Sequence, residues 1–447
     1  MMESKKIQIQ NLIIGFGKAG KTLAAELAKN GQKALLVERS DRMYGGTCIN
    51  IGCIPSKRLL TEAERLRDTD DKLAAFPLIM QRKETLTGAL RQANLNKLIS
   101  QDNIQVINAE ARFLSPDTVC LTGPGGEYEV KAERIFINTG AHAAHLSIPG
   151  SDGKRIYDST GFLALDELPH RVVIVGGGYI SLEFASMYTA LGSKVVILEA
   201  GSTFLAREDR DIAEEMQRIL LARGVEIVLN AQTIAFEESA DDTTVITSQG
   251  NFPADAVLIG IGRRPNTVGL DLQKAGITPD ARGFIPVDEH LQAAPNIWAM
   301  GDVAGSPQFT YMSLDDYRIV RDQLFGDGKR HRNDRQPIPT TVFTFPPLSH
   351  IGMTETQATQ QGLDVTVKKL PANAIPKAKV LGQTDGLLKA VIDNKTGVIL
   401  GATLFCAESH ELINLIKMAI DNHIPASYLR NQIFTHPTMA EALNDLF

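Results

Sequence analysis

Residues 7–20, IQIQNLIIGFGKAG, contain the strongest indication of fold in this chain. The apolar run 7–14 is typical of a strand buried in a parallel sheet, and it leads into three glycines spaced Gly-x-Gly-x-x-Gly. A helical stretch follows, and then a second strand, 33–37, that ends at Glu38. This order predicts a dinucleotide-binding unit. The glycines let the backbone approach a pyrophosphate, the helix N-terminus balances its charge, and Glu38 accepts hydrogen bonds from a ribose.

The same unit occurs a second time, with every landmark 161 positions further along the chain. Residues 171–175, RVVIV, form the strand, and the second strand of this unit ends at Glu199. The turn residues are Gly176, Gly178 and Ser181. Serine departs modestly from glycine at the third position, but it is small enough for close packing of the helix on the strand. Two such units predict an α/β protein with two Rossmann-like domains that bind two dinucleotides.

Residues 45–57, GGTCINIGCIPSK, hold two cysteines, Cys48 and Cys53. Pro55 indicates that a helix begins at Cys53. A regular helix separates residues five apart by about 7.5 Å, whereas a disulfide needs Cα atoms roughly 4.4–6.8 Å apart. Either Cys48 lies in a loop or a distorted first turn, or the pair does not bond. From these residues alone, three alternatives stay open: a redox-active pair activated by a helix N-terminus and a nearby lysine, two buried cysteines, or half of a metal site.

Length and composition limit the class of protein. At about 150 residues per domain, 447 residues predict three domains, and 43% apolar with 22% charged residues is typical of a globular protein. The formal net charge of −6 offers no attraction for nucleic acid or an anionic membrane. Four cysteines are too few for a disulfide scaffold, which indicates a cytoplasmic protein. The chain shows no signal peptide and no apolar run of about 18 residues, so we expect no membrane partner.

The remaining patterns predict further elements. Helices are expected at 53–67 and 81–101, and another from about Ser313. The last 110 residues follow a polar connector at 326–337 and are typical of a separate α+β domain.

These motifs resemble those of the class I pyridine nucleotide-disulfide oxidoreductases, or flavoprotein disulfide reductases. That family includes lipoamide dehydrogenase, glutathione reductase and mercuric reductase. The resemblance rests on GGTCINIGCIPSK and on further motifs that follow in order along nearly the whole chain. It is closest to the reactive-chlorine-resistance, RclA-like, branch, which is associated with NAD(P)H-driven copper(II) reduction. Three stretches carry this finer resemblance: IGFGKAGKTLA at 14–24, FTYMSLDDYRIVRD at 309–322 and IFTHPTMAEALNDLF at 433–447.

The resemblance implies four segments in the chain. They are an FAD-binding domain at 1–150 that contains the dithiol, an NAD(P)-binding domain at 151–284, a return to the central FAD domain at 285–335, and a C-terminal α+β dimerisation domain at 336–447. FAD is expected in the first glycine turn and the nicotinamide dinucleotide in the second. Glu199 favours NADH, because its carboxylate would repel a 2′-phosphate, although Arg207 could bind that phosphate and admit NADPH.

The resemblance also implies the catalytic residues, which are Cys48, Cys53, His436, Glu441, Lys57 and Glu183. Cys53 is the thiolate that faces the flavin, and Cys48 is the sulfur that meets the substrate. His436 acts as the base and Glu441 fixes its tautomer. Lys57 and Glu183 form an ion pair beside the flavin. Because this histidine reaches the dithiol of the other subunit in the family, the resemblance implies a homodimer with shared active sites.

The cofactor-binding residues follow from the same motifs. Those expected at FAD are Gly15, Gly17, Lys18, Ala19, Gly20, Glu38, Gly46, Thr47, Lys57, Ala111, Thr139, Gly140, Asp302 and Thr310. Those expected at NAD(P) are Gly176, Gly178, Tyr179, Ile180, Glu183, Glu199 and Gly262. Within these sets, Asp302 accepts a hydrogen bond from the sugar chain of the flavin, and Tyr179 covers the nicotinamide pocket until the cofactor arrives.

The identity of the electron acceptor is left open by these motifs. Our leading hypothesis is an NADH-consuming enzyme that passes electrons through FAD and the dithiol to Cu(II), in defence against oxidants, with transient metal contacts at Cys48 and Cys53. Cys406 and His410, four residues apart, could help to hold a soft metal ion, or be a buried thiol and a helix-start polar residue. The alternatives are a lipoamide dehydrogenase, another disulfide or metal reductase of the family, and a dithiol redox sensor that is not an enzyme. Glu199 disfavours glutathione reductase, and the absence of vicinal cysteines near Phe447 disfavours mercuric reductase.

Overall fold

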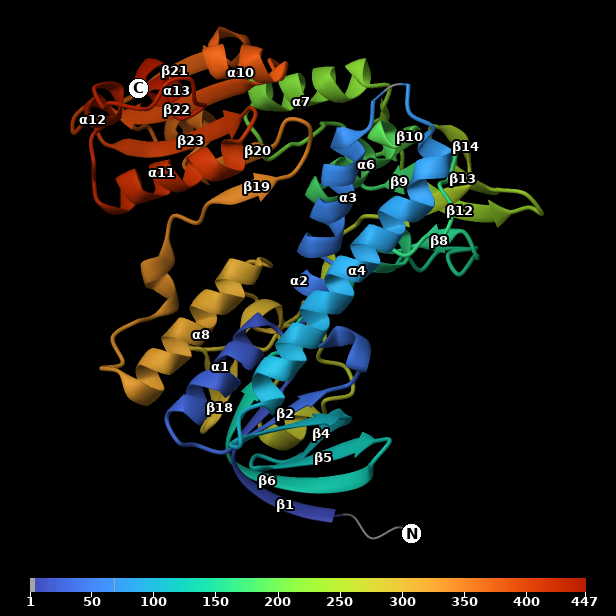
Figure 1. The fold of residues 1–447 in the computed structure, drawn as a ribbon, viewed down its shortest axis with the longest axis vertical. Coiled ribbons are helices and arrows are strands. Elements are labelled where there is room, and N and C mark those ends of the chain that lie inside the picture. Colours follow the sequence, from blue (N-terminus) through green and yellow to red (C-terminus); the bar gives the residue numbers. More distant parts are fainter. Residues whose placement is uncertain (1–4, 68) are drawn as a thin grey trace. The chain divides into compact units, whose positions relative to one another are not determined.

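The computed structural model describes residues 5–67 and 69–447, which form two compact units (Figure 1). The first unit contains the described residues up to Arg58, together with Leu78–Ala144 and Gly262–Arg335. The second unit contains the described residues of Leu59–Pro77, together with His145–Ile261 and Gln336–Phe447. Each unit holds one of the two glycine turns.

The first unit is built on a mixed sheet of eight strands whose path runs β17-β18-β6-β1-β2-β3; in addition, β5 pairs with β6, and β4 pairs with β5. The strands are β1 (Lys5–Ile14), β2 (Ala34–Glu38), β3 (Ile104–Asn108), β4 (Glu110–Ser115), β5 (Thr118–Gly123), β6 (Gly126–Ile137), β17 (Gln292–Ala294) and β18 (Ile297–Ala299). A separate two-stranded sheet pairs β7 (Ala141–Ala143) with β16 (Arg263–Pro265). The central strand β1 pairs in parallel with β2 and β6, and its last four residues are buried.

Helices and 3₁₀ turns accompany this sheet. They are α1 (Lys18–Lys29), η1 (Asp41–Met43), α2 (Thr47–Asn50), η2 (Leu272–Ala275), η3 (Gly301–Ala304), α8 (Thr310–Phe325) and η4 (Arg332–Arg335). Two more helices, α3 (Cys53–Arg65) and α4 (Lys72–Ile99), have residues in both units. Helices α1 and α8 lie together, since the Ala19 amide donates to Ser313 Oγ at 3.2 Å and Arg321 pairs with Glu26 at 3.1 Å.

The second unit begins with a parallel sheet in the order β11-β10-β9-β15-β8. Its strands are β8 (Ile156–Tyr157), β9 (Arg171–Val175), β10 (Lys194–Leu198), β11 (Glu226–Val228) and β15 (Ala256–Ile259). The helices here are α5 (Ser159–Phe162), α6 (Tyr179–Ala190) and α7 (Arg210–Ala222). An antiparallel sheet joins β12 (Thr233–Glu238), β13 (Thr243–Thr247) and β14 (Gly250–Ala254).

The C-terminal part of the second unit is an antiparallel sheet in the order β19-β20-β23-β22-β21. Its strands are β19 (Thr340–Val342), β20 (Leu348–Gly352), β21 (Val365–Pro371), β22 (Leu387–Asp393) and β23 (Ile399–Phe405). The helical elements are α9 (Glu355–Gln360), η5 (Ala372–Ala374), α10 (Pro376–Leu381), α11 (Ser409–Asp421), α12 (Ala426–Arg430) and α13 (Ala442–Leu446). Two Rossmann-like units and a C-terminal α+β domain are therefore present, which confirms the predicted fold class. Among the described helices, none combines the length and the apolar character that a membrane span requires.

The internal repeat extends to the register of the strands. Ile14 pairs with Val37 in the first unit, and Val175 pairs with Leu198 in the second, again 161 positions apart. In both units the amide of the first turn glycine donates to the carbonyl of that strand-end residue at 2.8 Å. The two glycine turns are therefore held on their sheets in the same way.

Ser181 fits its helix turn because of a change on the neighbouring strand. In the first unit, the Gly20 amide donates to Asn138 Oδ1 at 2.9 Å. In the second unit Ser181 takes the place of Gly20, and Gly260, which has no side chain, follows β15 where Asn138 follows β6. A Cβ atom on Gly260 would lie 2.3 Å from Ser181 Oγ. The side chain of Ser181 thus occupies space that is free because Gly260 has no side chain.

We expect Gly260→Ala to destabilise the protein by about 1–3 kcal/mol, because it overpacks this contact. Adding Ser181→Ala should restore most of that stability, since it removes the hydroxyl that the new methyl group would meet. Urea unfolding of the parent, both single variants and the double variant would measure the coupling. Equal losses in Gly260→Ala and the double variant would contradict this account.

Some element boundaries differ from the prediction. Helix α4 begins at Lys72 rather than at 81 and continues through Pro77. The carbonyl that Pro77 leaves without an N–H partner belongs to Leu73, which is 70% exposed, so water can satisfy it. Helix α8 begins at Thr310 rather than Ser313, because the chain enters the helix from an extended Phe309 that provides no side-chain cap.

Candidate functional site

The dithiol motif lies directly against the first glycine turn. Gly46 has φ +81°, and a Cβ atom there would lie 2.8 Å from the Cα of Gly17. Gly15 has φ +105°, and a Cβ atom there would lie 2.3 Å from the carbonyl oxygen of Asn138. Only glycines permit these backbone approaches without strain. They bring residues 45–50 to the N-terminus of α1.

This N-terminus has the properties of a phosphate site. Its N-cap, Gly17, provides no capping side chain, and the first turn contains no acidic residue. The partial positive charge of the helix end is therefore available to an anion. Glu38, at the end of β2, accepts hydrogen bonds from the amides of Phe16 at 3.0 Å and Ser40 at 3.3 Å. Burial raises the pKa of this carboxyl group. These residues fit the dinucleotide that the family implies.

A second carboxyl group of the first unit, that of Asp302, has no side-chain hydrogen-bond partner among the described residues. Asp302 lies in η3 with little exposure. Burial raises the pKa of its carboxyl group, whereas the positive charge of Arg263 has the opposite, smaller effect. Among the described residues, no other side chain is hydrogen-bonded to it. A largely buried carboxylate of this kind fits the hydroxyl groups of a ligand.

The other residues expected at FAD lie at several points of the first unit. Thr139 and Gly140 follow β6, and Thr139 Oγ1 donates to the carbonyl of Asn266 at 2.8 Å. Lys18, Ala19 and Gly20 form the first turn of α1, Thr47 begins α2, Lys57 lies in α3, and Ala111 lies in β4, where it pairs with Leu121. The roles of these residues toward FAD stay predictions.

The two cysteines lie on two different helices. Cys48 is in the one-turn helix α2, which ends at Asn50, and Cys53 begins α3, as predicted. The helical conformation is interrupted at Ile51–Gly52, between the two cysteines. The separation that a regular helix would impose on them therefore does not apply. Both residues are free thiols, and their side chains are hydrogen-bonded to each other. Cys48 thus lies neither in a loop nor in the first turn of α3.

The contacts of Cys48 favour its protonated form. The hydrogen bond to Cys53 raises the pKa of the Cys48 thiol most strongly, followed by burial and by the negative charge on Cys53. Two groups oppose this effect: the hydroxyl of Thr310, by a hydrogen bond, and the charge of Lys21. Thr310 also lies 3.7 Å from Cys53 Sγ, so its hydroxyl contacts both sulfur atoms. The geometry is that of a reduced dithiol whose two side chains are hydrogen-bonded to each other.

The second glycine turn repeats the first in detail. Gly176 has φ +99°, and Gly178 is an N-cap without a capping side chain. Glu199 accepts hydrogen bonds from the amides of Gly177 at 2.7 Å and Gly201 at 2.6 Å. These donors correspond to the two amides that Glu38 binds in the first unit. The second turn therefore fits a second dinucleotide.

The side chains around this turn are accessible. Tyr179 and Ile180 open α6 with exposures of 43% and 37%, and the Tyr179 hydroxyl donates to the carboxylate of Glu208. Glu183, one turn further along α6, accepts a hydrogen bond from the Phe343 amide at 3.0 Å. Its predicted ion pair with Lys57 stays a prediction. Gly262, with φ +111°, belongs to the first unit, unlike the other residues expected at NAD(P).

His436 and Glu441 form the predicted pair. His436 Nδ1 lies 2.7 Å from Glu441 Oε2, and the imidazole is 71% exposed while the carboxylate is 17% exposed. The Glu441 amide donates to Thr438 Oγ1 at 3.3 Å, which holds the carboxylate in place. A carboxylate on Nδ1 keeps the proton there and leaves Nε2 as the accessible base.

The suggested metal pair does not form a cluster. Cys406 is completely buried in the apolar core of the C-terminal domain, and burial raises the pKa of its thiol to about 12. The ring of His410 lies 5.4 Å from that of Phe343. Among residues 5–67 and 69–447, no group of three or more metal-binding side chains gathers anywhere. A soft-metal role for Cys406 and His410 stays a prediction that this burial disfavours.

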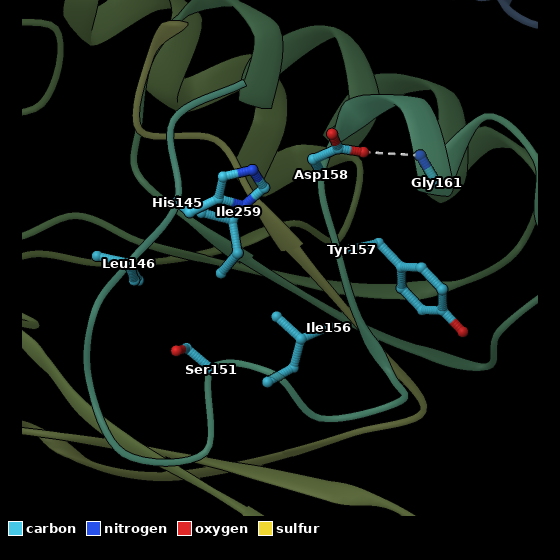
Figure 2. Close-up of a pocket in the computed structure, with 8 residues that line it drawn as sticks. All are labelled: His145, Leu146, Ser151, Ile156, Tyr157, Asp158, Gly161 and Ile259. Carbon is cyan, nitrogen blue, oxygen red and sulfur yellow. Dashed lines mark hydrogen bonds between the residues drawn. The ribbon is translucent and has the colours of Figure 1, made fainter. Parts of the chain in front are cut away.

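A cavity of about 310 Å³ opens in the second unit, and its lining is drawn in Figure 2. It is lined by His145, Leu146, Ser151, Ile156, Tyr157, Asp158, Gly161 and Ile259. The Asp158 carboxylate, which could have faced a ligand, instead accepts a hydrogen bond from the Gly161 amide at 2.8 Å and caps α5. None of the predicted site residues lines this cavity.

The sequence did not indicate the contacts that two residues make beside the dithiol. Lys21 interacts electrostatically with Cys48, yet it is the residue after the Gly-x-Gly-x-x-Gly pattern and no spacing rule indicates its direction. Thr310 was expected at FAD, and its hydroxyl lies against the sulfur atoms.

Comparison with known proteins identifies the family. The model of the pyridine nucleotide-disulphide oxidoreductases matches residues 9–316, and the model of their dimerisation domain matches residues 338–447, which supports a homodimer. The chain is 51% identical over 440 residues to the probable pyridine nucleotide-disulfide oxidoreductase RclA of Escherichia coli, covering 98% of both chains. It is 35% identical to the dihydrolipoyl dehydrogenase of Chlamydia muridarum, covering 96% of this chain and 94% of that one.

Solved structures agree with this result. The fold matches that of the HOCl-induced flavoprotein disulfide reductase RclA from Escherichia coli with a TM-score of 0.94 and 50% identity, covering 98% of this chain and 99% of that one. A Cu(II) complex of the same protein matches with a TM-score of 0.95, covering 98% of both chains. The chain therefore belongs to the pyridine nucleotide-disulphide oxidoreductase family, whose enzymes use FAD and NAD(P)H, and it is a homologue of the flavoprotein disulfide reductase RclA.

Proposed function

We propose that this enzyme uses NADH to reduce Cu(II) through the Cys48–Cys53 dithiol, in defence against reactive chlorine species. The observation that carries the proposal is the pair of hydrogen-bonded thiols packed against the first dinucleotide turn. The acceptor is inferred from the Escherichia coli relative, which is HOCl-induced and has been solved as a Cu(II) complex. Thiolates are also ligands that copper favours.

The electron balance defines the stoichiometry. With Cys53 as thiolate and Cys48 as thiol, the reduced pair gives up two electrons and one proton when its disulfide forms, so it reduces two Cu(II) ions to Cu(I). FAD, when bound, links the hydride chemistry of a nicotinamide to a disulfide. Over a full cycle, one NADH and two Cu(II) yield one NAD⁺, two Cu(I) and one proton.

The residues of this chain have distinct tasks in the proposal. Cys53 holds the negative charge of the reduced pair, and Cys48 keeps the proton until the acceptor arrives. The hydroxyl of Thr310, 3.7 Å from Cys53 Sγ, donates to this thiolate in the proposal and stabilises its charge. The His436–Glu441 pair then takes the proton from Cys48 of the other subunit. Glu199 selects NADH, and Lys57 with Glu183 forms the ion pair beside the first dinucleotide.

The proposal includes the organisation of the whole protein. The FAD domain comprises 1–150 and 285–335, the NAD(P) domain 151–284, and the dimerisation domain 336–447. The active site is shared between two subunits in this arrangement. Free thiols at all four cysteines are consistent with a cytoplasmic location.

Anaerobic reoxidation should identify the acceptor. The purified flavoprotein is first reduced with NADH, and separately with NADPH, and then mixed with Cu(II), lipoamide, oxidised glutathione or Hg(II). We expect NADH to reduce it more readily and Cu(II) to reoxidise it fastest, with two Cu(II) consumed per NADH. Reoxidation by lipoamide that is orders of magnitude faster than by Cu(II) would identify a lipoamide dehydrogenase instead. If the enzyme reduces only one equivalent of each acceptor and does not turn over, it is a redox sensor.

A further inference from the structure

The side chain of Tyr179 is held at the second glycine turn by a hydrogen bond to Glu208. Tyr179 is the first residue of α6, directly after the N-cap Gly178, and it is 43% exposed. Its hydroxyl donates to the carboxylate of Glu208. Burial, and then the negative charge of Glu208, raises the pKa of this hydroxyl, which is therefore the proton donor. The ring is thus fixed at the helix end that fits a dinucleotide phosphate.

The loop that carries Glu208 is shaped by Arg210. The guanidinium group donates to three carbonyl oxygens, those of Phe204 at 3.0 Å, Leu205 at 2.5 Å and Glu208 at 2.9 Å. Leu205 has φ +46°, which a residue other than glycine adopts only where the surrounding contacts enforce it. Arg210 therefore determines the path of residues 204–208.

The next residue, Asp209, attaches the same loop to the C-terminal domain within the second unit. Its carboxylate accepts hydrogen bonds from the amides of Glu355 and Thr356, both at 3.0 Å. It also pairs with Lys389 of β22 at 2.9 Å, and both charged side chains are buried. A buried ion pair whose members are hydrogen-bonded is costly to break. The backbone of the loop is therefore fixed by contacts that do not involve Tyr179.

These contacts make the Glu208 carboxylate a fixed acceptor for a ring that could otherwise move. An exposed side chain changes rotamer within about nanoseconds when no partner holds it. In the proposed function Tyr179 covers the nicotinamide pocket, so its ring must leave this position before the dinucleotide binds. A hydrogen bond that stabilises the covering position lowers the fraction of enzyme that can bind, and the apparent affinity falls in proportion.

We infer that Glu208 is a positioning residue of the nucleotide site, which holds Tyr179 in its covering position and thereby weakens the binding of NADH. The inference rests on the proposed function for the placement of the nicotinamide dinucleotide and for the covering role of Tyr179. It deepens that function by adding Glu208 to the residues that determine the affinity for NADH. No covalent bond forms or breaks in this step.

Nucleotide binding to the holoenzyme tests the inference. Isothermal titration calorimetry measures the binding of NAD⁺, which cannot reduce the flavin, to the oxidised protein. We expect Tyr179→Phe, which keeps the ring and removes the hydroxyl, to bind NAD⁺ about fivefold more tightly, the factor that corresponds to one hydrogen bond of ordinary net strength. Glu208→Ala should have the same effect. Urea unfolding and flavin absorbance show whether each variant keeps its fold and cofactor.

Anaerobic stopped-flow absorbance gives the second measurement, which is flavin reduction at increasing concentrations of NADH. In Tyr179→Phe and in Glu208→Ala, the half-saturating NADH concentration should fall by the same factor of about five. The limiting rate should be unchanged, because the movement of a side chain is fast compared with hydride transfer. A general loss of structure would not produce tighter binding at an unchanged limiting rate.

A double-mutant cycle separates the hydrogen bond from the charge of Glu208, since removal of a carboxylate near an anion site can by itself favour a dinucleotide. In the Tyr179→Phe background, Glu208→Ala should change the dissociation constant of NAD⁺ by less than about twofold, because the hydrogen bond is already absent. Glu208→Gln removes the same charge but keeps an oxygen that can accept from the hydroxyl, so it should stay closer to the parent. Glu214→Gln removes an equal charge from an exposed residue of α7 and should bind NAD⁺ as the parent does.

Unchanged or weaker binding of NAD⁺ by Tyr179→Phe would overturn the inference. An equal gain from Glu208→Ala in both backgrounds would also overturn it, because the charge rather than the hydrogen bond would then be responsible. A parent enzyme whose flavin NADH does not reduce would refute the proposed placement of the nicotinamide dinucleotide, and this inference with it. Failure of the parent to reduce Cu(II) would instead remove the proposed acceptor, and the nucleotide result would stand.

Discussion

Cys48→Ser is expected to lower steady-state Cu(II) reduction by about a hundredfold or more, since serine can neither form a disulfide nor release an electron to the acceptor. The variant should still bind flavin and accept one equivalent of hydride from NADH, because Cys48 contributes no part of either glycine turn. Stopped-flow absorbance separates these two half-reactions. The expected pattern is normal reduction followed by arrested reoxidation.

Cys120→Ala provides the matched control. Cys120 is a buried thiol of β5, and it lies in the sheet rather than beside the dithiol. Its replacement should leave both half-reactions within about twofold of the parent, because only a small apolar contact is lost. Turnover of Cu(II) by Cys48→Ser at the rate of the parent would contradict the proposed electron path.

Gly15→Ala and Gly176→Ala should separate the two dinucleotide sites. Both glycines have positive φ, near +100°, where alanine costs about 1–3 kcal/mol. The methyl group at Gly15 would also lie 2.3 Å from the carbonyl oxygen of Asn138, and the one at Gly176 would lie 2.8 Å from that of Gly260. We expect Gly15→Ala to lose flavin and Gly176→Ala to keep it.

The second of these variants gives the sharper result. Gly176→Ala should be yellow and folded, yet NADH should reduce its flavin at least about tenfold more slowly at a fixed concentration, because the second turn is displaced. Reduction by dithionite, which needs no nucleotide site, should be unaffected. The absorbance spectrum and urea unfolding distinguish lost cofactor from lost fold. Colourless Gly176→Ala with yellow Gly15→Ala would reverse the assignment of the two turns.

The glycine turns and their strands could be predicted because they depend on neighbours in the chain. The run 7–14, the turn after it and the strand that ends at Glu38 were found, and so was their copy 161 positions later. The start of α3 at Cys53 was likewise indicated by Pro55. In contrast, no strand was predicted at β14, which contains Pro253; proline is tolerated there because β14 is an edge strand paired with β13.

The environment of the two sulfur atoms of the dithiol could be obtained only from the tertiary structure. Lys21 meets Asn94, which is 73 positions away, and Cys53 meets Thr310, which is 257 positions away. Local patterns report which residues share a strand or a helix, since these depend on backbone periodicity. The electrostatics of a thiol depends on distances between side chains, and these distances are fixed only when distant segments pack together.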